Sequence, residues 1–365
     1  MRYALILAGG RGTRLWPMST RELPKQLIPF IGGRSLLQIA VERLAGLLPA
    51  DHVYICADEA YRRQILSHLP TIRKAQFIGE PTGRDTLNAV GLSAAVLSRQ
   101  DPEAVIGVFT ADHLIRPEDE FRQIVARGYE LAQRPEPTLV TFGVTPSFAA
   151  TGYGYLQLGP QLDESGARVV QQFKEKPDAA VAQQYLAAGP NQYLWNSGMF
   201  VWRASVLMRC IASYAPQNFQ GLQRCRDAWG TPQQQAVLER EYPQLPKISV
   251  DYAVMEPASR DPAVTVAALP MPLQWLDVGS WPSFGQTCPK DHAGNAASGG
   301  RQLLLDTRNT LVVSSEQDHL IAAIGVEDLI VIHTPRATLV CRADQAERIK
   351  QLHQQIGEQH GPEWL

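Results

Sequence analysis

The first 145 residues alternate short apolar runs with segments of helical periodicity, and this alternation constrains the fold more than any other feature. The apolar run Tyr3–Ala8 is typical of a buried strand, and Ser35–Leu48 carries apolar residues at the three- and four-residue spacing of a helix face. Ser35 and Gln38 have the spacing of a capping box, which would satisfy backbone amides at the helix start. Strands that alternate with helices form a Rossmann-like, mainly parallel sheet covered on both faces.

The same criteria predict the other elements of this α/β part and of the stretch that follows it. In the first part these are strands at His52–Cys56, Ala75–Ile78, Val105–Thr110 and Leu139–Val144, and helices at Glu59–His68, Thr86–Arg99 and Asp119–Ala132. After residue 150 the apolar runs Gly152–Leu156 and Arg168–Phe173 flank a turn-rich stretch and predict a hairpin. Further elements are expected as helices at Ala179–Ala187, Ser205–Tyr214 and Pro232–Arg240, and as strands at Trp195–Trp202 and Val264–Leu269.

A stretch rich in Gly, Ala, Ser and Asn, His292–Gly300, predicts a domain boundary. We therefore expect a large domain over residues 1–292 and a small β domain with a closing helix over residues 300–365. The small domain contains β runs at Leu303–Leu305, Thr310–Val313, Leu320–Ile324, Leu329–His333 and Thr338–Val340, followed by a polar helix at about Asp344–Gln359.

Charge and cysteine usage exclude several classes of protein. Lys and Arg number 34 against 36 Asp and Glu, so the formal net charge is −2 and the basic stripe of a nucleic-acid binder is not expected. No run reaches the ~18 apolar residues of a membrane span. We expect no signal peptide, because the chain starts directly on a strand-like run. Five widely spaced cysteines without a C-x-x-C pair favour a reducing cytoplasm over a disulfide framework or zinc site.

A glycine-rich loop directly follows the first expected strand. Its residues, which we predict to bind a nucleotide, are Leu7, Ala8, Gly9, Gly10, Arg11, Gly12 and Thr13. Three glycines let backbone amides approach a phosphate, and Arg11, Arg14 and Lys25 add positive charge. The loop lacks the lysine of a P-loop, and Leu15 stands where a dinucleotide fingerprint has its third glycine. A plain strand–turn–helix connection is the alternative, but it needs neither three glycines nor two arginines.

The loop and several later motifs resemble the sugar-1-phosphate nucleotidyltransferases, and the mannose-1-phosphate guanylyltransferase branch in particular. The segments that carry the resemblance are Ala8–Pro17 with Pro24–Gln26, Glu80–Thr86, Ala111–His113, Thr151–Tyr155, Phe173–Pro177, Trp195–Phe200, Ser249–Glu256 and Trp275–Trp281. They follow one another in the family's order over nearly the whole chain. The resemblance implies a GT-A-like catalytic domain over residues 1–292, followed by the short β domain of bacterial members. For that tail we expect structural packing or a homodimer contact. Because the tail shows no His-x-His cluster, we expect no isomerase activity.

The reaction implied by this resemblance is attack of a sugar-1-phosphate oxygen on the α-phosphorus of a nucleoside triphosphate, with loss of pyrophosphate. The attacking phosphate is already ionised near neutral pH, so the chemistry needs positioning and charge neutralisation rather than a general base. We assign catalytic roles to Arg14, Lys25, Asp112 and Lys176. Asp112, after the strand that ends at Thr110, and Asp277 would hold Mg²⁺, although an Asp at that place is also a common helix cap. His113 is expected to be packed or hydrogen-bonded.

The resemblance also implies a sugar-phosphate site and a base-side loop. The expected substrate-binding residues are Gly152, Tyr153, Gly154, Glu175, Lys176, Asn196, Gly198 and Asp251. A solvated charge pair is the alternative for Glu175 and Lys176. The aromatic residues that would wall the site or simply pack in the core are Tyr153, Trp195, Trp202, Trp275 and Trp281. Glu80 and Asp85 belong to the base-side loop, where Asp85-Thr86-Leu87-Asn88 replaces the usual Asn-Thr-Ala-Pro. Asp85 can accept hydrogen bonds from guanine but cannot donate one.

We therefore expect a Mg²⁺-dependent enzyme that makes GDP-mannose from GTP and mannose 1-phosphate for polysaccharide or glycolipid assembly, with no nucleic-acid or membrane partner. Two alternatives stay open from the sequence. The same chemistry could act on another sugar 1-phosphate or triphosphate, or the chain could be a catalytically inactive subunit that senses a nucleotide sugar. A metal-dependent glycosyltransferase is a weaker alternative, because Ala111 stands where its Asp-x-Asp motif would need a carboxylate.

Overall fold

The computed structural model describes residues 1–10 and 12–365, and these form two compact units. Unit 1 contains residues 1–9, 40–111 and 115–275. Unit 2 contains residues 10–39, 112–114 and 276–365, and so combines three segments that lie far apart in the sequence. The two compact units do not test whether residues 1–292 and 300–365 are separate domains, so the boundary at residues 292–300 stays a prediction.

Unit 1 is built on a nine-stranded sheet in the order β3-β2-β1-β4-β9-β6-β10-β8-β7. The strands are β1 (Arg2–Leu7), β2 (Val53–Asp58), β3 (Phe77–Glu80), β4 (Val105–Thr110), β6 (Thr138–Val144), β7 (Tyr155–Gln161), β8 (Arg168–Lys174), β9 (Tyr193–Arg203) and β10 (Thr265–Pro270). β1 pairs in parallel with β2 and β4, whereas β9 runs antiparallel to both β4 and β6. The sheet is therefore mixed: its first four strands are parallel to one another, and β6 and β10 form a second parallel pair.

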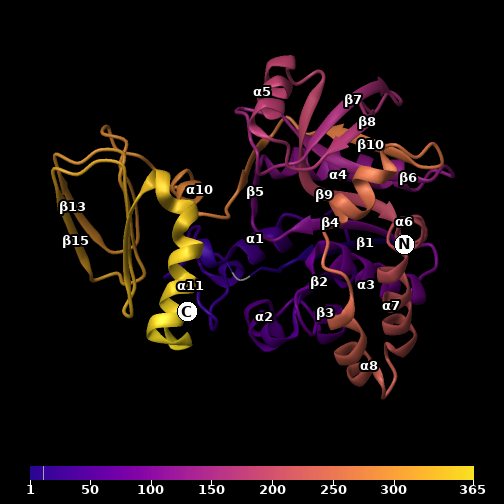
Figure 1. Cartoon of the computed structure of the whole chain (residues 1–365), viewed down its shortest axis with the longest axis horizontal. Helices are drawn as coiled ribbons and strands as arrows, with labels where there is room; N and C mark the ends of the chain where they lie inside the picture. Colours follow the sequence, from indigo (N-terminus) through magenta and orange to yellow (C-terminus); the bar gives the residue numbers. More distant parts are fainter. Residues whose placement is uncertain (11) are drawn as a thin grey trace. The chain divides into compact units, whose positions relative to one another are not determined.

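The central strands of the four-stranded parallel part, β1 and β4, are apolar over most of their length, as expected of strands covered on both faces. In β1 the residues Tyr3–Ile6 are buried, and in β4 so are all residues before Thr110. The helices in the connections between these strands are α1 (Leu36–Glu42), α2 (Arg62–His68), α3 (Asp85–Gln100), α4 (Glu118–Ala132), α5 (Ala179–Ala188), α6 (Ala204–Tyr214), α7 (Pro216–Ala228), α8 (Gln234–Glu241) and α9 (Glu256–Ala258). α3 is buried over most of its length and packs against α6 and α7, which lie beside it in Figure 1.

Unit 2 holds the short strands of the C-terminal part. A four-stranded sheet has the order β12 (Ala296–Ser298), β14 (Leu311–Ser314), β16 (Leu329–His333) and β17 (Thr338–Arg342). A separate parallel pair consists of β13 (Arg301–Leu305) and β15 (Leu320–Ile324), which lie side by side in Figure 1. The chain continues through a 3-10 segment, η8 (Ala343–Arg348), into the closing helix α11 (Ile349–His360).

One apolar core holds unit 2 together. It joins residues of the glycine-loop segment to residues of the C-terminal part. Its fully buried members include Leu15, Leu36, Trp281 and Ile332, and the indole Nε1 of Trp281 donates to the Trp16 carbonyl oxygen at 3.0 Å. The structural packing expected of the tail is therefore present, since its strands and helix cover the segment that follows β1.

The structure confirms the predicted pattern of elements and corrects some boundaries. The capping box is confirmed, because the Ser35 amide donates to Gln38 Oε1 at 2.9 Å and the Gln38 amide donates to Ser35 Oγ at 3.1 Å. The helix it starts ends at Glu42, so the expected end at Leu48 was wrong. Sequence reasoning missed α7 together with β5 (His113–Arg116), β11 (Gln274–Asp277) and α10 (Trp281–Gly285). Among the described residues, no helix is both long and apolar enough to span a bilayer.

Candidate active site

The glycine loop begins where β1 ends. The Ala8 amide still donates to the Cys56 carbonyl of β2, at 2.9 Å. Beyond it, the side-chain amide of Gln26 donates to the Gly10 carbonyl oxygen at 3.1 Å. Gly12 has a φ of 66°, and a Cβ at this position would lie 2.6 Å from Cβ of Lys25. Only glycine fits there, because a side chain would meet both backbone strain and a steric clash.

Arg14 follows in a short 3-10 turn, η1 (Thr13–Leu15), and its guanidinium reaches the C-terminal part of unit 2. Arg14 Nη1 lies 3.0 Å from Oε1 of Glu347, a residue of η8 that sequence reasoning did not single out. Both side chains are largely exposed, so the contact is a surface ion pair that screening weakens. Arg11, which we predicted to bind the nucleotide, lies outside the described residues.

Lys25 and Asp112 form the tightest ionic contact of this cluster. Lys25 Nζ lies 2.5 Å from Asp112 Oδ2, and both side chains are mostly buried. Burial opposes the charge on Lys25, but the Asp112 carboxylate next to it raises the pKa of Lys25 above its usual value. Burial likewise opposes ionisation of Asp112, but the Lys25 ammonium beside it holds the pKa of Asp112 below its usual range.

A backbone hydrogen bond next to Asp277 connects its segment to that of Asp112. The amide of Val278 donates to the Asp112 carbonyl oxygen at 3.0 Å, so the segment that carries Asp277 is fastened to the one that carries Asp112. Ligand atoms of Asp112, His113 and Asp277 lie within 4.8 Å of one another. Burial raises the pKa of Asp277, and repulsion from the Asp112 carboxylate raises it further. A cation between the two carboxylates would relieve that repulsion.

This donor set fits a hard divalent cation. Two carboxylates in a partly exposed position leave room for water and phosphate oxygens, which Mg²⁺ prefers as its other ligands. His113 is buried, and its Nε2 lies 3.9 Å from Asp112 Oδ1. Its burial agrees with the expectation of a packed histidine rather than a solvent-facing base.

A second cluster, entirely within unit 1, contains four of the predicted sugar-site residues. The side-chain amide nitrogen of Asn196 donates to Asp251 Oδ1 at 2.8 Å, and its oxygen accepts from the Thr141 hydroxyl at 2.8 Å. Burial raises the pKa of Asp251, and the nearby Glu175 carboxylate raises it further. Burial also raises the pKa of Glu175, although Lys176 opposes this effect. Both shifts favour the protonated form of these carboxyl groups. Thr141 was missed by sequence reasoning.

Two neighbours of Glu175 define the space around its carboxylate. Lys176 Nζ lies 3.3 Å from Glu175 Oε1, but over half of the Lys176 side chain is exposed and its φ is 44°, a rare conformation for lysine. A Cβ on Gly154 would lie 2.5 Å from Glu175 Oε2, so any side chain at this position would displace the Glu175 carboxylate. The other two glycines predicted for the sugar site have different surroundings. A Cβ on Gly152 would meet no atom within 4 Å, whereas Gly198 has a φ of 69°, which favours glycine.

The predicted aromatic residues divide into two groups. Tyr153 lies 5.2 Å from Trp195 and 5.3 Å from Trp275, measured between ring centroids, and the exposed Phe148 packs on Trp195 at 4.9 Å. In contrast, Trp202 and Trp281 are fully buried and belong to the cores of their units. Core packing is therefore the role of these two tryptophans.

The base-side residues Glu80 and Asp85 have different surroundings. Glu80 is buried at the end of β3, where its Oε1 accepts a hydrogen bond of 2.6 Å from the Tyr242 hydroxyl. Burial raises the pKa of Glu80 to about 7. Asp85 is exposed at the start of α3 with a φ of 66°, a conformation that Asp and Asn adopt more readily than most residues. Asn88, which stands where the family's usual motif has proline, is buried and donates to the carbonyl oxygens of Arg84 and Pro246.

Comparisons with known proteins identify the family. The family model described as Nucleotidyl transferase matches residues 3–294. This chain belongs to the nucleotidyl transferase family. A second model, described as MannoseP isomerase/GMP-like beta-helix domain, matches residues 300–356. The resemblance stated from the motifs is confirmed.

Relatives and solved structures of this nucleotidyl transferase agree with that assignment. A mannose-1-phosphate guanylyltransferase of Klebsiella pneumoniae is 36% identical over 355 residues, which cover 96% of this chain and 73% of the relative. The xanthan biosynthesis protein XanB of Xanthomonas campestris is 36% identical over 358 residues, covering 96% of this chain and 72% of XanB. A crystal structure from Thermus thermophilus, described as mannose-1-phosphate geranyltransferase, has a TM-score of 0.85 and 31% identity and covers 97% of this chain and 99% of that one. The expected nucleotidyltransferase fold with a small C-terminal β domain and closing helix is confirmed.

Proposed function

We propose that this nucleotidyl transferase makes GDP-mannose and pyrophosphate from GTP and mannose 1-phosphate. The observation that carries this proposal is the likeness over nearly the whole chain to mannose-1-phosphate guanylyltransferases, at 36% identity to the relative from Klebsiella pneumoniae. The Lys25–Asp112–Asp277 cluster supplies the charges that this chemistry demands. An intact cluster of this kind favours an active enzyme over a subunit that only senses nucleotide sugar.

The residues of unit 2 provide what an in-line phosphoryl displacement requires. The glycine loop offers backbone amides to the triphosphate, and Arg14 and Lys25 neutralise negative charge that accumulates on it. Lys25 is held by Asp112 at 2.5 Å, so its ammonium is charged and positioned before the substrate binds. An attacking oxygen of mannose 1-phosphate carries its own negative charge, and no residue of the chain has to remove a proton from it.

We propose Mg²⁺ as the divalent cation, held by Asp112 and Asp277. When bound, Mg²⁺ would lower the repulsion between the two substrates and favour departure of pyrophosphate. The two carboxylates lie close together despite their mutual repulsion, as the raised pKa of Asp277 indicates, so cation binding is favoured at this place. His113 is a poor ligand for Mg²⁺, which prefers oxygen.

The residues of the second cluster suit a sugar. Asn196, Asp251 and Glu175 present amide and carboxyl groups that can bind hydroxyls in a fixed arrangement, since Thr141 and Asn196 hold one another. Lys176 adds a half-exposed positive charge for the sugar phosphate. The Tyr153–Trp195–Trp275 group offers aromatic faces, on which the apolar side of a sugar ring can pack. Asp85 and Glu80 are proposed for the guanine side.

Pyrophosphate release is the measurement that tests this function. GTP, ATP, UTP, CTP and dTTP are each combined with mannose 1-phosphate and glucose 1-phosphate, with Mg²⁺ present. Fast release with GTP and mannose 1-phosphate alone is the expected result. Release with another pair would keep the chemistry and change the substrates. Nucleotide binding without release from any pair would contradict the proposal and favour a sensing subunit.

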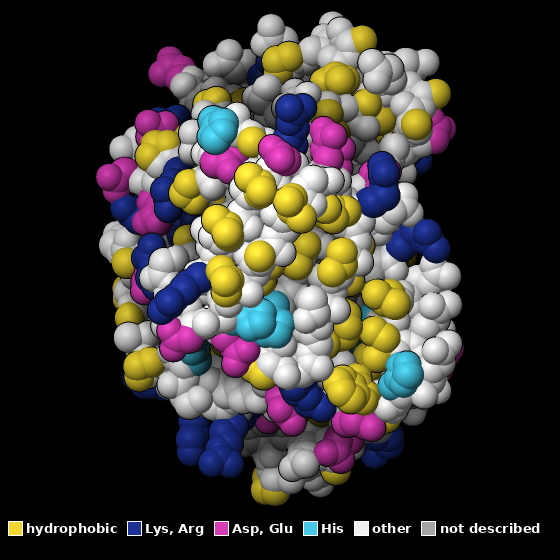
Figure 2. Space-filling model, turned by 90° about the vertical axis from the view of Figure 1, so that its left-hand side faces the viewer, with side chains coloured by type: hydrophobic (Ala, Val, Ile, Leu, Met, Phe, Trp, Pro, Cys, Tyr) yellow, Lys and Arg dark blue, Asp and Glu magenta, His cyan; other side chains and the backbone are white. Residues whose placement is uncertain are grey.

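Two further proposals concern the state of the protein in the cell. We propose a homodimer, for which the outward face of β13 and β15 is the contact: Leu303, Leu305, Leu320 and Ile324 are more than half exposed there, and Figure 2 shows hydrophobic side chains gathered on this side. Light scattering on the wild type and on Leu305→Glu, which should be monomeric, tests it. We also propose a cytoplasmic location, which the five free cysteines support and cell fractionation would test.

A further inference from the structure

Two histidines and a glutamate meet at one end of the C-terminal strands, and none of the three has been assigned a role above. Glu316 and His319 lie in the connection between β14 and β15, and His333 is the last residue of β16. This connection is anchored to β16, because the Ser315 amide donates to the His333 carbonyl oxygen at 3.0 Å. The backbone therefore fixes the points from which all three side chains start.

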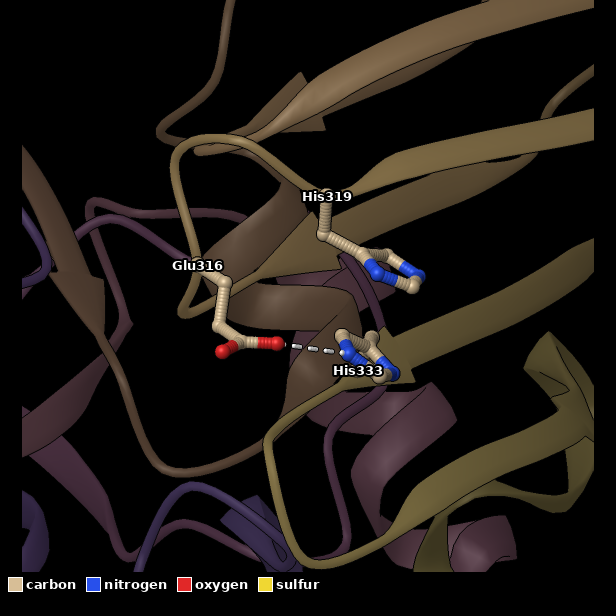
Figure 3. A group of neighbouring side chains, drawn as sticks. All are labelled: Glu316, His319 and His333. Atoms are coloured by element: carbon tan, nitrogen blue, oxygen red, sulfur yellow. Dashed lines mark hydrogen bonds and ion pairs between the residues drawn. The ribbon is translucent and has the colours of Figure 1, made fainter.

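Glu316 points toward His333, and the His319 ring lies over the His333 ring (Figure 3). His333 Nε2 lies 3.1 Å from Glu316 Oε2, and the imidazoles of His319 and His333 stack with centroids 3.6 Å apart and planes 11° from parallel. One ligand atom from each residue lies within 4.8 Å of the other two.

His333 Nε2 is engaged with Glu316, so a ligand has to replace that hydrogen bond. His333 Nδ1 is 3.0 Å from the Thr338 hydroxyl, which can donate to a bare nitrogen or accept from a protonated one. His333 can therefore exchange tautomers and free Nε2 without losing this bond. A fixed partner on the second ring nitrogen is also the usual support of a metal-bound histidine. Within the part of the chain that the structure describes, neither ring nitrogen of His319 has a hydrogen-bonding partner.

We propose that Glu316, His319 and His333 bind a transition-metal dication of the Zn²⁺ class. Two imidazoles and one carboxylate are a common donor set for Zn²⁺, with water completing the coordination at this partly exposed place. Ligand atoms about 2.0–2.2 Å from such an ion must lie about 3.5 Å or less from one another. Glu316 and His333 already satisfy this limit, whereas the His319 ring must turn out of its stacked position to bring a nitrogen to the same point.

Binding would clip the 315–319 connection to the end of β16. The ion would join residues 17 positions apart in the sequence, Glu316 and His333, and would also secure His319 at the start of β15. An ion that binds only the folded chain raises the thermal midpoint as its concentration rises. The site is therefore structural, and its ion differs in class from the Mg²⁺ proposed for Asp112 and Asp277.

The test is a Co²⁺ titration of the full-length, untagged protein in millimolar Mg²⁺, which keeps the Asp112–Asp277 carboxylates occupied. Histidine-bound Co²⁺ absorbs in the visible, and we expect about one equivalent per chain, displaced by Zn²⁺ and not by more Mg²⁺. The variants His319→Ala and His333→Ala should each weaken binding at least about tenfold. The exposed His360 provides the matched control, and His360→Ala should bind as the wild type does.

Two further variants keep the outcome decisive. Glu316→Gln changes one exposed side chain and should weaken binding in a chain that folds normally, even where a histidine variant does not. Asp277→Asn should bind Co²⁺ unchanged, because it is not part of this site. The proposal is overturned if Co²⁺ gives no visible band, if the band persists in Glu316→Gln, His319→Ala and His333→Ala alike, or if Asp277→Asn abolishes it. A Zn²⁺-dependent rise of the thermal midpoint, absent from Glu316→Gln, is the independent readout.

Discussion

Arg14 and Glu347 form a two-point ion pair, in which Arg14 Nη1 lies 3.0 Å from Oε1 and 3.1 Å from Oε2 of the glutamate. The pair links the glycine-loop segment to the last part of the chain, within unit 2. It also occupies the guanidinium that we assign to the triphosphate. Glu347 and a phosphate oxygen would therefore compete for Arg14.

Removing this competitor should improve nucleotide binding slightly. We expect Glu347→Gln to lower the KM for GTP two- to fivefold with little change in kcat, because an exposed ion pair contributes at most about 1 kcal/mol. Steady-state kinetics at low salt, where the pair is strongest, is the measurement. Glu358→Gln, an exposed change on α11, is the control. An unchanged KM in both variants would mean that Arg14 does not have to leave Glu347.

The two carboxylates of the proposed metal site should respond differently to neutralisation. Asp277→Asn and Asp112→Asn should each lower kcat at least about a hundredfold if both hold the cation. Asp277→Asn should leave stability unchanged or raise it, since it removes repulsion from Asp112. Asp112→Asn should also lower the thermal midpoint, because it leaves the mostly buried Lys25 ammonium without its partner. Turnover as a function of Mg²⁺ and thermal melts together separate the two effects. Near-normal turnover of Asp277→Asn would remove it from the site.

The buried Glu80 should make stability depend on pH. Its pKa is about 7 in the folded chain and near 4.5 in the unfolded chain, so between these values the folded chain binds the extra proton. Its contribution to stability is therefore full below about pH 4.5 and is lost as the pH rises through about 7. Glu80→Gln keeps an acceptor for Tyr242 and removes this loss, worth up to about 3 kcal/mol. Thermal melts at about pH 5 and pH 8 should show a smaller difference for Glu80→Gln than for the wild type or the exposed Glu103→Gln. Equal differences in all three would contradict the burial argument.

Alanine variants of Gly152 and Gly154 can separate a clash with a neighbouring side chain from a clash with the bound sugar. Gly154→Ala places a Cβ 2.5 Å from Glu175 Oε2, so Glu175 must move, and the KM for the sugar phosphate should rise at least about tenfold. Gly152→Ala places its Cβ more than 4 Å from every neighbouring atom and should leave the free protein undisturbed. A raised KM in Gly152→Ala would then report a contact with the sugar itself. If Gly154→Ala has normal kinetics, Glu175 does not bind the sugar phosphate.

Helices and strands with a regular apolar pattern could be predicted from the sequence. Those stabilised by residues distant in the sequence were missed. β4 was predicted at its observed bounds, Val105–Thr110, because its apolar run is uninterrupted. α7 was missed because its sequence is largely polar. Its buried face includes Asn218, which is satisfied by hydrogen bonds to Asn88 and Pro246 rather than by apolar packing. Short elements such as β5, with four residues, carry too little pattern to be recognised.

The same distinction applies to the site. A motif identifies its own residues as candidates for the site. The Lys25–Asp112 contact and the Asn196–Asp251 hydrogen bond both join residues that the motifs had identified. Their supporting partners could not be found in this way. Thr141 and Tyr242 lie 55 and 162 positions from the residues that they hold, and neither stands in a recognisable motif. Glu347 likewise lies in a polar segment where a single carboxylate carries no signal.

The shared core of unit 2 has a consequence for biosynthesis on the ribosome. Leu15, Trp16 and Ile28 emerge first, but their packing partners Trp281 and Ile332 are made more than 250 residues later. At about 5–20 residues per second, these N-terminal apolar side chains wait roughly 10 to 60 seconds before they can be buried. The strands of unit 1 can pair during that interval, whereas the glycine loop acquires its final support only after Trp281 and Ile332 have been made. A nascent chain that stalls before residue 281 would thus present an aggregation-prone start, and chaperone binding to residues 10–39 is to be expected during translation.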